Sequence, residues 1–298
     1  MTIDMATPEM DRLMEKDSPL EKIGTGFMFT EGPVWHRQER VLRFSDIPAN
    51  QIKQWSQAAG VTTYREPSAK SNGMTYDRQG RLVVCEHSGR RVSRTEADGS
   101  LTTLAILFEG KRLNSPNDVA CKSDGAIYFS DPDYGIVMER VGAPMPKELP
   151  FNGVFRISPD GKQLTCLARD FQTPNGLAFS PDERTLYVDD TVRMHIRAFD
   201  VKADGSLANG RVFATLAGDG TGRPDGMKVD VQGNVYCTGP GGVHVLAPDG
   251  RLLGRIRTPA TCANLAWGED DGKTLFLMVS DSVYRLRMLV AGVAVGKG

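Results

Sequence analysis

Residues 72–87 have the sequence NGMTYDRQGRLVVCEH, and this pattern decides the fold because it recurs six times along the chain. Each copy starts with an acidic or amide residue and continues as a short apolar strand. A polar turn rich in Asp and Gly follows, of the kind that tight hairpins require, and then a second apolar strand. The copies begin between 39 and 58 residues apart, at Glu31, Asn72, Asn117, Asn175, Asp225 and Asn264.

This spacing is typical of a four-stranded propeller blade. The remainder of each copy supplies two outer strands. In residues 91–105 (RVSRTEADGSLTTLA) and 153–168 (GVFRISPDGKQLTCLA), for example, an Asp-Gly turn separates two strands of alternating character. The sequence therefore predicts an all-β chain that forms one six-bladed β-propeller, with four antiparallel strands per blade and a central channel.

The predicted propeller domain covers residues 26–288. An N-terminal arm, residues 1–25, precedes it and contains a short helix around Pro8–Lys16. A tail, residues 289–298, follows it, and in this tail a final strand frays. Residues 136–152 contain Pro144, Pro146 and Pro150, which makes a regular strand there unfavourable. This long loop between blades is either a lid over a site or an insertion without a role.

Composition excludes several classes of function. The 36 basic and 37 acidic side chains nearly cancel, which argues against a nucleic-acid partner, and no apolar run is long enough to span a membrane. The N-terminus lacks a basic stretch followed by an apolar one, and the five cysteines show no metal-binding spacing. These features predict a cytoplasmic protein with reduced thiols. A monomer and a homodimer are both compatible with the sequence, and no nucleophile elbow or phosphate-binding loop is present.

The six leading residues predict a cation site. The first strand of each propeller blade lines the channel, so these residues would form one ring of oxygen-bearing side chains. Asn and Asp are poor strand formers, and gathering them in a channel costs desolvation unless a cation pairs with them. The ligand chemistry suits Ca²⁺ first, then Mg²⁺ or Mn²⁺, with Zn²⁺ less supported because the four histidines form no paired motif. The alternative is that the Asn-Gly and Asp-Gly dipeptides at 72, 175 and 225 are ordinary turns.

Four separated motifs resemble the SMP-30/gluconolactonase family. They are FTEGPVW (29–35), SPNDV (115–119), TPNGLAFSPD (173–182) and RPDGM (223–227), and the resemblance extends from about residue 26 to residue 286. It implies a six-bladed propeller with one divalent metal ion in the channel, closest to the bacterial gluconolactonase branch. It also implies that Glu31, Asn175 and Asp225 are metal ligands, and that Asn117 contacts the metal or a water on it.

The sequence departs from the family at one place that bears on the substrate. Some members carry an arginine two residues before the channel asparagine to hold a sugar acid, but this chain has Ser115 there, with Arg112 slightly upstream. The exact substrate is therefore left open. His87 could instead cap a strand end, and Arg112 could belong to a surface loop. The candidates for substrate contacts are Asn72, His87, Arg112, Asp131, Tyr134 and Asn264.

The resemblance implies hydrolysis of a small-molecule lactone of the sugar type. The metal would polarise the lactone carbonyl group, and Asp225 would act as general base towards water. Because metal coordination weakens a carboxylate as a base, a water activated by the metal is the alternative nucleophile. Two other functions are considered: hydrolysis of phosphotriesters or fluorophosphates at the same metal, and a non-catalytic ligand-binding propeller with a structural metal. The inward convergence of charged and amide groups favours catalysis over the last of these.

Overall fold

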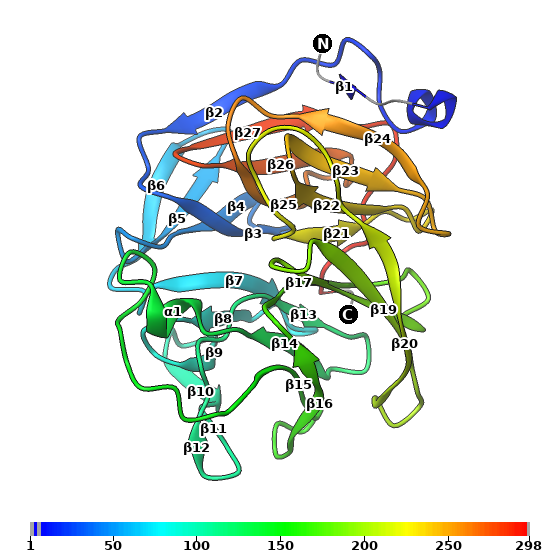
Figure 1. Cartoon of the computed structure of the whole chain (residues 1–298). Helices are drawn as coiled ribbons and strands as arrows, with labels where there is room; N and C mark the ends of the chain where they lie inside the picture. Colours follow the sequence, from blue (N-terminus) through cyan, green and yellow to red (C-terminus); the bar gives the residue numbers. More distant parts are fainter. Residues whose placement is uncertain (1–2, 5–6, 297–298) are drawn as a thin grey trace.

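Six antiparallel sheets surround one central axis and form a β-propeller (Figure 1). The computed structural model describes residues 3–4 and 7–296. In each sheet the first strand of the sequence repeat is the innermost, and it contacts the innermost strands of the two neighbouring sheets. The predicted architecture of six blades with four antiparallel strands each is therefore confirmed.

The strands of each blade follow one another from the channel outward. Blade 1 comprises β3 (Thr30–His36), β4 (Val41–Asp46), β5 (Gln51–Ser56) and β6 (Gly60–Arg65), and blade 2 comprises β7 (Ser71–Tyr76), β8 (Leu82–Glu86), β9 (Arg91–Thr95) and β10 (Leu101–Ala105). Blade 3 comprises β13 (Val119–Cys121), β14 (Ile127–Asp131), β15 (Asn152–Ile157) and β16 (Leu164–Phe171), and blade 4 comprises β17 (Pro174–Phe179), β18 (Thr185–Asp190), β19 (His195–Val201) and β20 (Leu207–Thr215). Blade 5 comprises β21 (Met227–Val229), β22 (Val235–Gly239), β23 (Gly242–Leu246) and β24 (Leu252–Arg257), and blade 6 contains β25 (Cys262–Gly268), β26 (Thr274–Val279) and β27 (Ser282–Arg287). A small ribbon, β11 (Leu107–Phe108) and β12 (Lys111–Arg112), follows blade 2.

The N-terminal segment completes two of the sheets. Strand β2 (Glu21–Thr25) pairs with β27 and is the outermost strand of blade 6, while β1 (Ile3–Asp4) pairs with β24 as a fifth strand of blade 5. Residues predicted to form an arm outside the propeller thus join its sheets. This pairing satisfies the exposed edges of both blades and fastens the two ends of the chain together. The short helix expected nearby is a 3₁₀-helix (η1, Pro8–Arg12).

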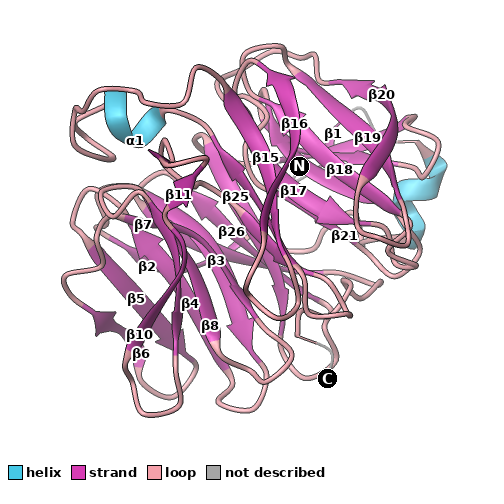
Figure 2. Cartoon of the chain, turned by 90° about the horizontal axis from the view of Figure 1, so that it is seen from below, coloured by secondary structure: helices cyan, strands magenta, loops and turns pink. Residues whose placement is uncertain are grey.

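The C-terminal tail contains no strand within the described residues. Beyond β27 it forms a single β-bridge, between Gly292 and Asp230, so the prediction of a final strand in residues 289–298 is wrong as far as residue 296. The physical reason is that β27 is already paired on both sides, with β26 and β2. Residues 293–296 instead line a cavity of about 380 Å³. Figure 2 shows α1 (Tyr134–Val137) outside the sheets, on one side of the propeller.

The apolar core lies between neighbouring sheets, because most strands are buried on both faces. Separate clusters fill the spaces between successive blades. Between blades 6 and 1, for example, the rings of Trp35 and Phe276 stack with centroids 5.5 Å apart. No helix in the part of the chain that the structure describes has the length and apolar character of a membrane span. The blades therefore form a rigid frame that holds the inner strands in place.

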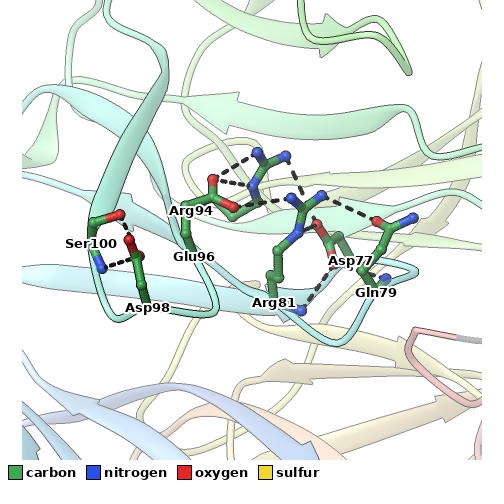
Figure 3. A network of polar contacts seen from close by, with 7 residues as sticks. All are labelled: Asp77, Gln79, Arg81, Arg94, Glu96, Asp98 and Ser100. Carbon is green, nitrogen blue, oxygen red and sulfur yellow. Dashed lines mark hydrogen bonds and ion pairs between the residues drawn. The ribbon is translucent and has the colours of Figure 1, made fainter.

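Charged side chains hold the turns of blade 2 together (Figure 3). The Arg81 guanidinium donates from Nε to Asp77 Oδ2 at 2.8 Å and from Nη1 to Glu96 Oε2 at 3.0 Å. Arg94 also pairs with Glu96, at 2.7 Å. The network links the turn between β7 and β8 with the turn between β9 and β10, at a partly exposed site.

We expect Arg81→Ala to lower the free energy of unfolding by less than about 1 kcal/mol, because solvent screens partly exposed ion pairs. Asp77 Oδ1 still accepts the backbone N–H groups of residues 79 and 81 in the variant. Urea denaturation of the two proteins measures the difference. A loss several times larger would mean that this network, and not the packing between blades, stabilises blade 2.

Candidate functional site

The six leading residues of the repeats lie in one ring around the channel. The contacts of the glycines that follow four of them, together with the hydrogen bond from Asn264 to Glu31, link neighbouring positions of the ring. A Cβ atom added to Gly32 would lie 1.9 Å from the backbone oxygen of Asn72, and one added to Gly226 would lie 2.1 Å from the side-chain amide of Asn264. The glycine that follows the leading residue of one blade therefore packs against the leading residue of the next blade. Glycine is needed because the inner strands approach too closely for any side chain.

The alternative interpretation, that these dipeptides are turns, is wrong. Gly73 lies within β7 and Gly176 within β17, and neither has a positive φ. The N–H of Gly73 donates to the backbone oxygen of Asn117 in the next blade, at 2.7 Å. Asn-Gly thus marks a close approach between strands of different blades.

Glu31 is held by its neighbours in the ring. Its Oε2 accepts the backbone N–H of Gly32 at 2.7 Å and the side-chain N–H of Asn264 at 2.9 Å. The side-chain oxygen of Asn264 in turn accepts the N–H of Leu265 at 2.8 Å. Asn264, predicted to contact water or substrate, therefore orients the Glu31 carboxylate, and its oxygen already has a partner.

The channel carboxylates repel one another. Burial raises the pKa of Glu31 to about 7, against the hydrogen bonds from Asn264 and Gly32. Burial first, and then repulsion by Glu31, raise the pKa of Asp225 well above its usual range. Two neighbouring negative charges in a desolvated channel are unfavourable without a counter-charge.

These residues fit a hard divalent cation. A cation with oxygen ligands would offset the repulsion between Glu31 and Asp225, and the amide side chains of Asn117 and Asn175 are buried in the same ring. The described residues contain no group of three or more His, Cys, Asp or Glu side chains suited to a metal, so the candidate set is two carboxylates with amide oxygens. Such a set suits Ca²⁺ better than Zn²⁺.

His87 is buried and both ring nitrogens have partners. Nδ1 lies 3.0 Å from the backbone oxygen of Val141, and Nε2 lies 3.2 Å from the side-chain nitrogen of Asn72. Burial lowers the pKa of His87 to about 4, so the ring is neutral at physiological pH. The structure thus brings His87 to the ring through Asn72, with no ring nitrogen free for a substrate.

Two other predicted residues lie beside the ring and stabilise loops. Asp131 is fully buried, its Oδ2 accepts the N–H of Asn114 at 2.8 Å, and burial raises its pKa to about 7. Arg112 donates from Nη2 to the backbone oxygen of Gly89 at 2.8 Å, and its own N–H donates to Glu148. The hydrogen-bond partners of both residues lie in loops outside the ring, and Asp131 Oδ1 has no partner among the described residues.

Tyr134 lies at the site itself. It starts α1 and lies near Thr191 and Asp225. Thr191 Oγ1 accepts the side-chain N–H of Asn175 at 3.0 Å and donates to the backbone oxygen of Pro224 at 2.8 Å. Burial and the nearby Asp225 raise the pKa of Tyr134, so the phenol is protonated at neutral pH. The tyrosine is therefore a neutral hydrogen-bonding group beside two of the predicted metal ligands.

Comparison with known proteins identifies the family of this chain. The family model described as SMP-30/Gluconolactonase/LRE-like region matches residues 29–281. The chain belongs to this family. A gluconolactonase of Zymomonas mobilis is 34% identical over 96% of this chain and 86% of its own length. The solved structure of a gluconolactonase from Xanthomonas campestris superposes with a TM-score of 0.90 at 36% identity, covering 97% of this chain and 95% of that one. The pentonolactonase XacC of Haloferax volcanii is 25% identical over 86% of this chain and 82% of its own length.

The departure from the family at Ser115 has a structural explanation. Ser115 Oγ donates to the backbone oxygen of Pro132 at 2.7 Å and accepts the N–H of Gly135 at 2.8 Å. A Cβ atom on Gly135 would lie 2.7 Å from the Cβ atoms of both Ser115 and His87. The start of α1 thus fills the space that a long side chain at position 115 would need.

A second group of charged residues, not predicted from the sequence, lies beside the ring. Asp118 and Asp189 are buried, and one oxygen of each has no hydrogen-bond partner among the described residues. Burial raises the pKa of both Asp118 and Glu31, and the charge of Lys228, whose Nζ lies 3.9 Å from Asp118 Oδ2, opposes that rise. The sequence contains one indication of this group. In four of the six repeats the leading residue is followed by glycine, whereas Asn117 is followed by Asp118.

Proposed function

We propose that this chain hydrolyses a sugar-type lactone, with gluconolactone as the first candidate, using one divalent cation in the central channel. Family membership and relatives named gluconolactonase, pentonolactonase and 6-deoxy-6-sulfogluconolactonase support the reaction. The observation that carries the proposal is the convergence of Glu31 and Asp225, two mutually repelling carboxylates, in a ring with buried asparagines. Ca²⁺ is the first candidate for the cation, followed by Mg²⁺, Mn²⁺ and Zn²⁺.

Glu31, Asn117, Asn175 and Asp225 would hold the cation, which would polarise the lactone carbonyl group as a Lewis acid. Asn264 and the N–H of Gly32 keep the Glu31 carboxylate directed to this place. Thr191 orients Asn175 in the same way, because its hydroxyl oxygen accepts the side-chain N–H of Asn175.

Asp225 is the residue proposed to move the proton. Its carboxylate removes a proton from the water that attacks the carbonyl carbon. The ring C–O bond then breaks, and the departing ring oxygen takes up this proton, which gives a hydroxy acid and restores the carboxylate. Burial and Glu31 raise the pKa of this carboxylate in the metal-free protein, and a bound cation would oppose that rise. The hydroxyl group of Tyr134, close to Asp225, is placed to orient the substrate.

Metal removal tests the proposal directly. The metal-stripped protein should release no acid from D-glucono-δ-lactone above the uncatalysed rate. Adding Ca²⁺, Mg²⁺, Mn²⁺ or Zn²⁺ separately should restore turnover with at least one of them. Stoichiometric metal binding without turnover would direct the search to other lactones and to phosphotriesters. Turnover that persists in the metal-free protein would contradict the role assigned to the ring.

A further inference from the structure

We propose that His87 is a positioning residue that fixes the side chain of Asn72, so that Asn72 Oδ1 accepts a hydrogen bond from a hydroxyl group of the substrate. His87 also ties residues 134–145, the covering segment, to this arrangement. The inference rests on the proposed lactone hydrolysis and names a residue that would recognise the substrate. It assigns to His87 a role other than the substrate contact expected from the sequence.

The orientation of the His87 ring follows from its partners. The backbone oxygen of Val141 can only accept a hydrogen bond, so Nδ1, 3.0 Å away, must carry the proton. The ring is 1% exposed and neutral at physiological pH, so Nε2 has no proton and must accept. Nε2 therefore takes an N–H from Asn72, at 3.2 Å.

The same bond determines which way the Asn72 amide faces. With its nitrogen held against His87, Oδ1 must point to the other side of the amide. Asn72 is 4% exposed, and Oδ1 is buried with no hydrogen-bond partner among the described residues. An unpaired buried carbonyl oxygen is unfavourable, and a ligand that donates a hydrogen bond to it removes this cost. A sugar-type lactone carries several hydroxyl groups that can do so.

The backbone of Asn72 cannot shift to relieve this oxygen. Its carbonyl oxygen accepts the hydroxyl proton of Ser45 at 2.8 Å and packs against Gly32 of the neighbouring blade. The position of the amide is thus set by the ring, and its orientation is set by His87.

The covering segment is anchored to the loops beside β3, β7 and β8. Lys70 Nζ donates to the backbone oxygen of Glu139 at 2.8 Å, and Arg140 Nη2 donates to that of Met28 at 2.8 Å. Gly135 packs against His87 with no room for a side chain. Among these anchoring residues, His87 is the one whose side chain also hydrogen bonds to a side chain of the channel ring, that of Asn72. When the segment is in place, it seals the His87–Asn72 pair from bulk water.

Two substitutions separate the two bonds of His87. The amide of asparagine in His87→Asn reaches about the place of Nδ1 and can still donate to Val141. The amide of glutamine in His87→Gln reaches about the place of Nε2 and can still accept from Asn72. Lys70→Met is the matched control, because it removes an anchor of the same segment that has no path to Asn72.

The first measurement uses substrate discrimination. Wild-type protein with its metal should hydrolyse D-glucono-δ-lactone at least 10-fold better, in kcat/KM, than one of its monodeoxy analogues. Asn72→Ala and His87→Asn should bring that ratio close to 1, whereas His87→Gln and Lys70→Met should keep it. The proposal is overturned if His87→Asn discriminates as the wild type does, or if His87→Gln loses discrimination as fully as Asn72→Ala.

The second measurement needs no activity, so it tests the coupling even if the proposed function fails. Hydrogen exchange over residues 134–145 of the ligand-free protein should be at least 10-fold faster in His87→Gln than in the wild type. His87→Asn should exchange at about the wild-type rate. Equal exchange in the two variants would contradict the bond from Nδ1 to Val141, and ¹⁵N spectra showing a proton on Nε2 would contradict the assigned orientation of Asn72.

Discussion

Asp225→Asn is expected to lower kcat/KM for lactone hydrolysis by a factor of about 10³ or more, because an amide of the same shape can neither accept the proton nor balance a divalent cation. Metal affinity should fall as well. The metal-free variant should be at least as stable as the metal-free wild type, since the substitution removes a buried charge that Glu31 repels. Acid release from D-glucono-δ-lactone and thermal unfolding with and without Ca²⁺ measure these effects.

The matched control makes the same Asp-to-Asn substitution at a residue outside the channel. Asp270 is exposed and pairs with Arg40 at 3.0 Å, so Asp270→Asn should leave both activity and metal response unchanged. If Asp225→Asn retained more than a tenth of the activity, neither the general base nor the ligand role could be assigned to Asp225. If it bound Ca²⁺ normally but lost activity, the base role alone would remain.

Gly176→Ala is expected to lower the free energy of unfolding by about 3 kcal/mol, the upper part of the range for overpacking. The added methyl group would lie 2.0 Å from the backbone oxygen of Asp225 and 2.9 Å from the backbone nitrogen of Met227. Both atoms belong to the neighbouring inner segment and cannot rotate away as a side chain would. Urea denaturation measures the loss, and activity should fall with it because Asp225 is displaced.

Gly99→Ala is the control for the glycine substitution. Gly99 has φ of +82° in an outer turn, and a Cβ atom there would meet no neighbour within 4 Å. Its replacement should cost only the backbone strain of a left-handed residue, about 1–2 kcal/mol, and should leave activity intact. Equal losses for the two variants would show that the inner strands do not approach as closely as the ring requires.

Much of the fold was predictable because its signals are local. Blade length, the turn residues and the alternation of apolar side chains each depend on neighbouring positions in the chain. The recurrence of an acidic or amide residue at Glu31, Asn72 and their four counterparts then required only the geometry of a propeller to form a ring. The closure of blade 6 by β2 was not predictable in this way, because residues 21–25 carry no copy of the repeat.

The site was predictable only in part. The ring positions followed from the repeat. However, Asn264 donates a hydrogen bond to Glu31, which is 233 positions away in the sequence. No pattern in the sequence around Asn264 indicates that it orients a carboxylate. No sequence feature distinguishes Lys228 from other strand residues, and only the folded structure brings it near Asp118. Such pairings depend on which faces of different blades meet.

The sequence by itself determined the six-bladed architecture and the six residues of the channel ring. The reason is that the alternation of apolar residues in strands and the spacing of the blade repeats depend only on the order of residues along the chain. Only the tertiary structure decided how those residues are used. In the folded chain the two ring nitrogens of His87 lie against Asn72 and Val141, and the start of α1 fills the space beside Ser115. The reason is physical: hydrogen-bond direction, burial and repulsion between charges depend on distances of a few ångströms between blades, which no local pattern encodes.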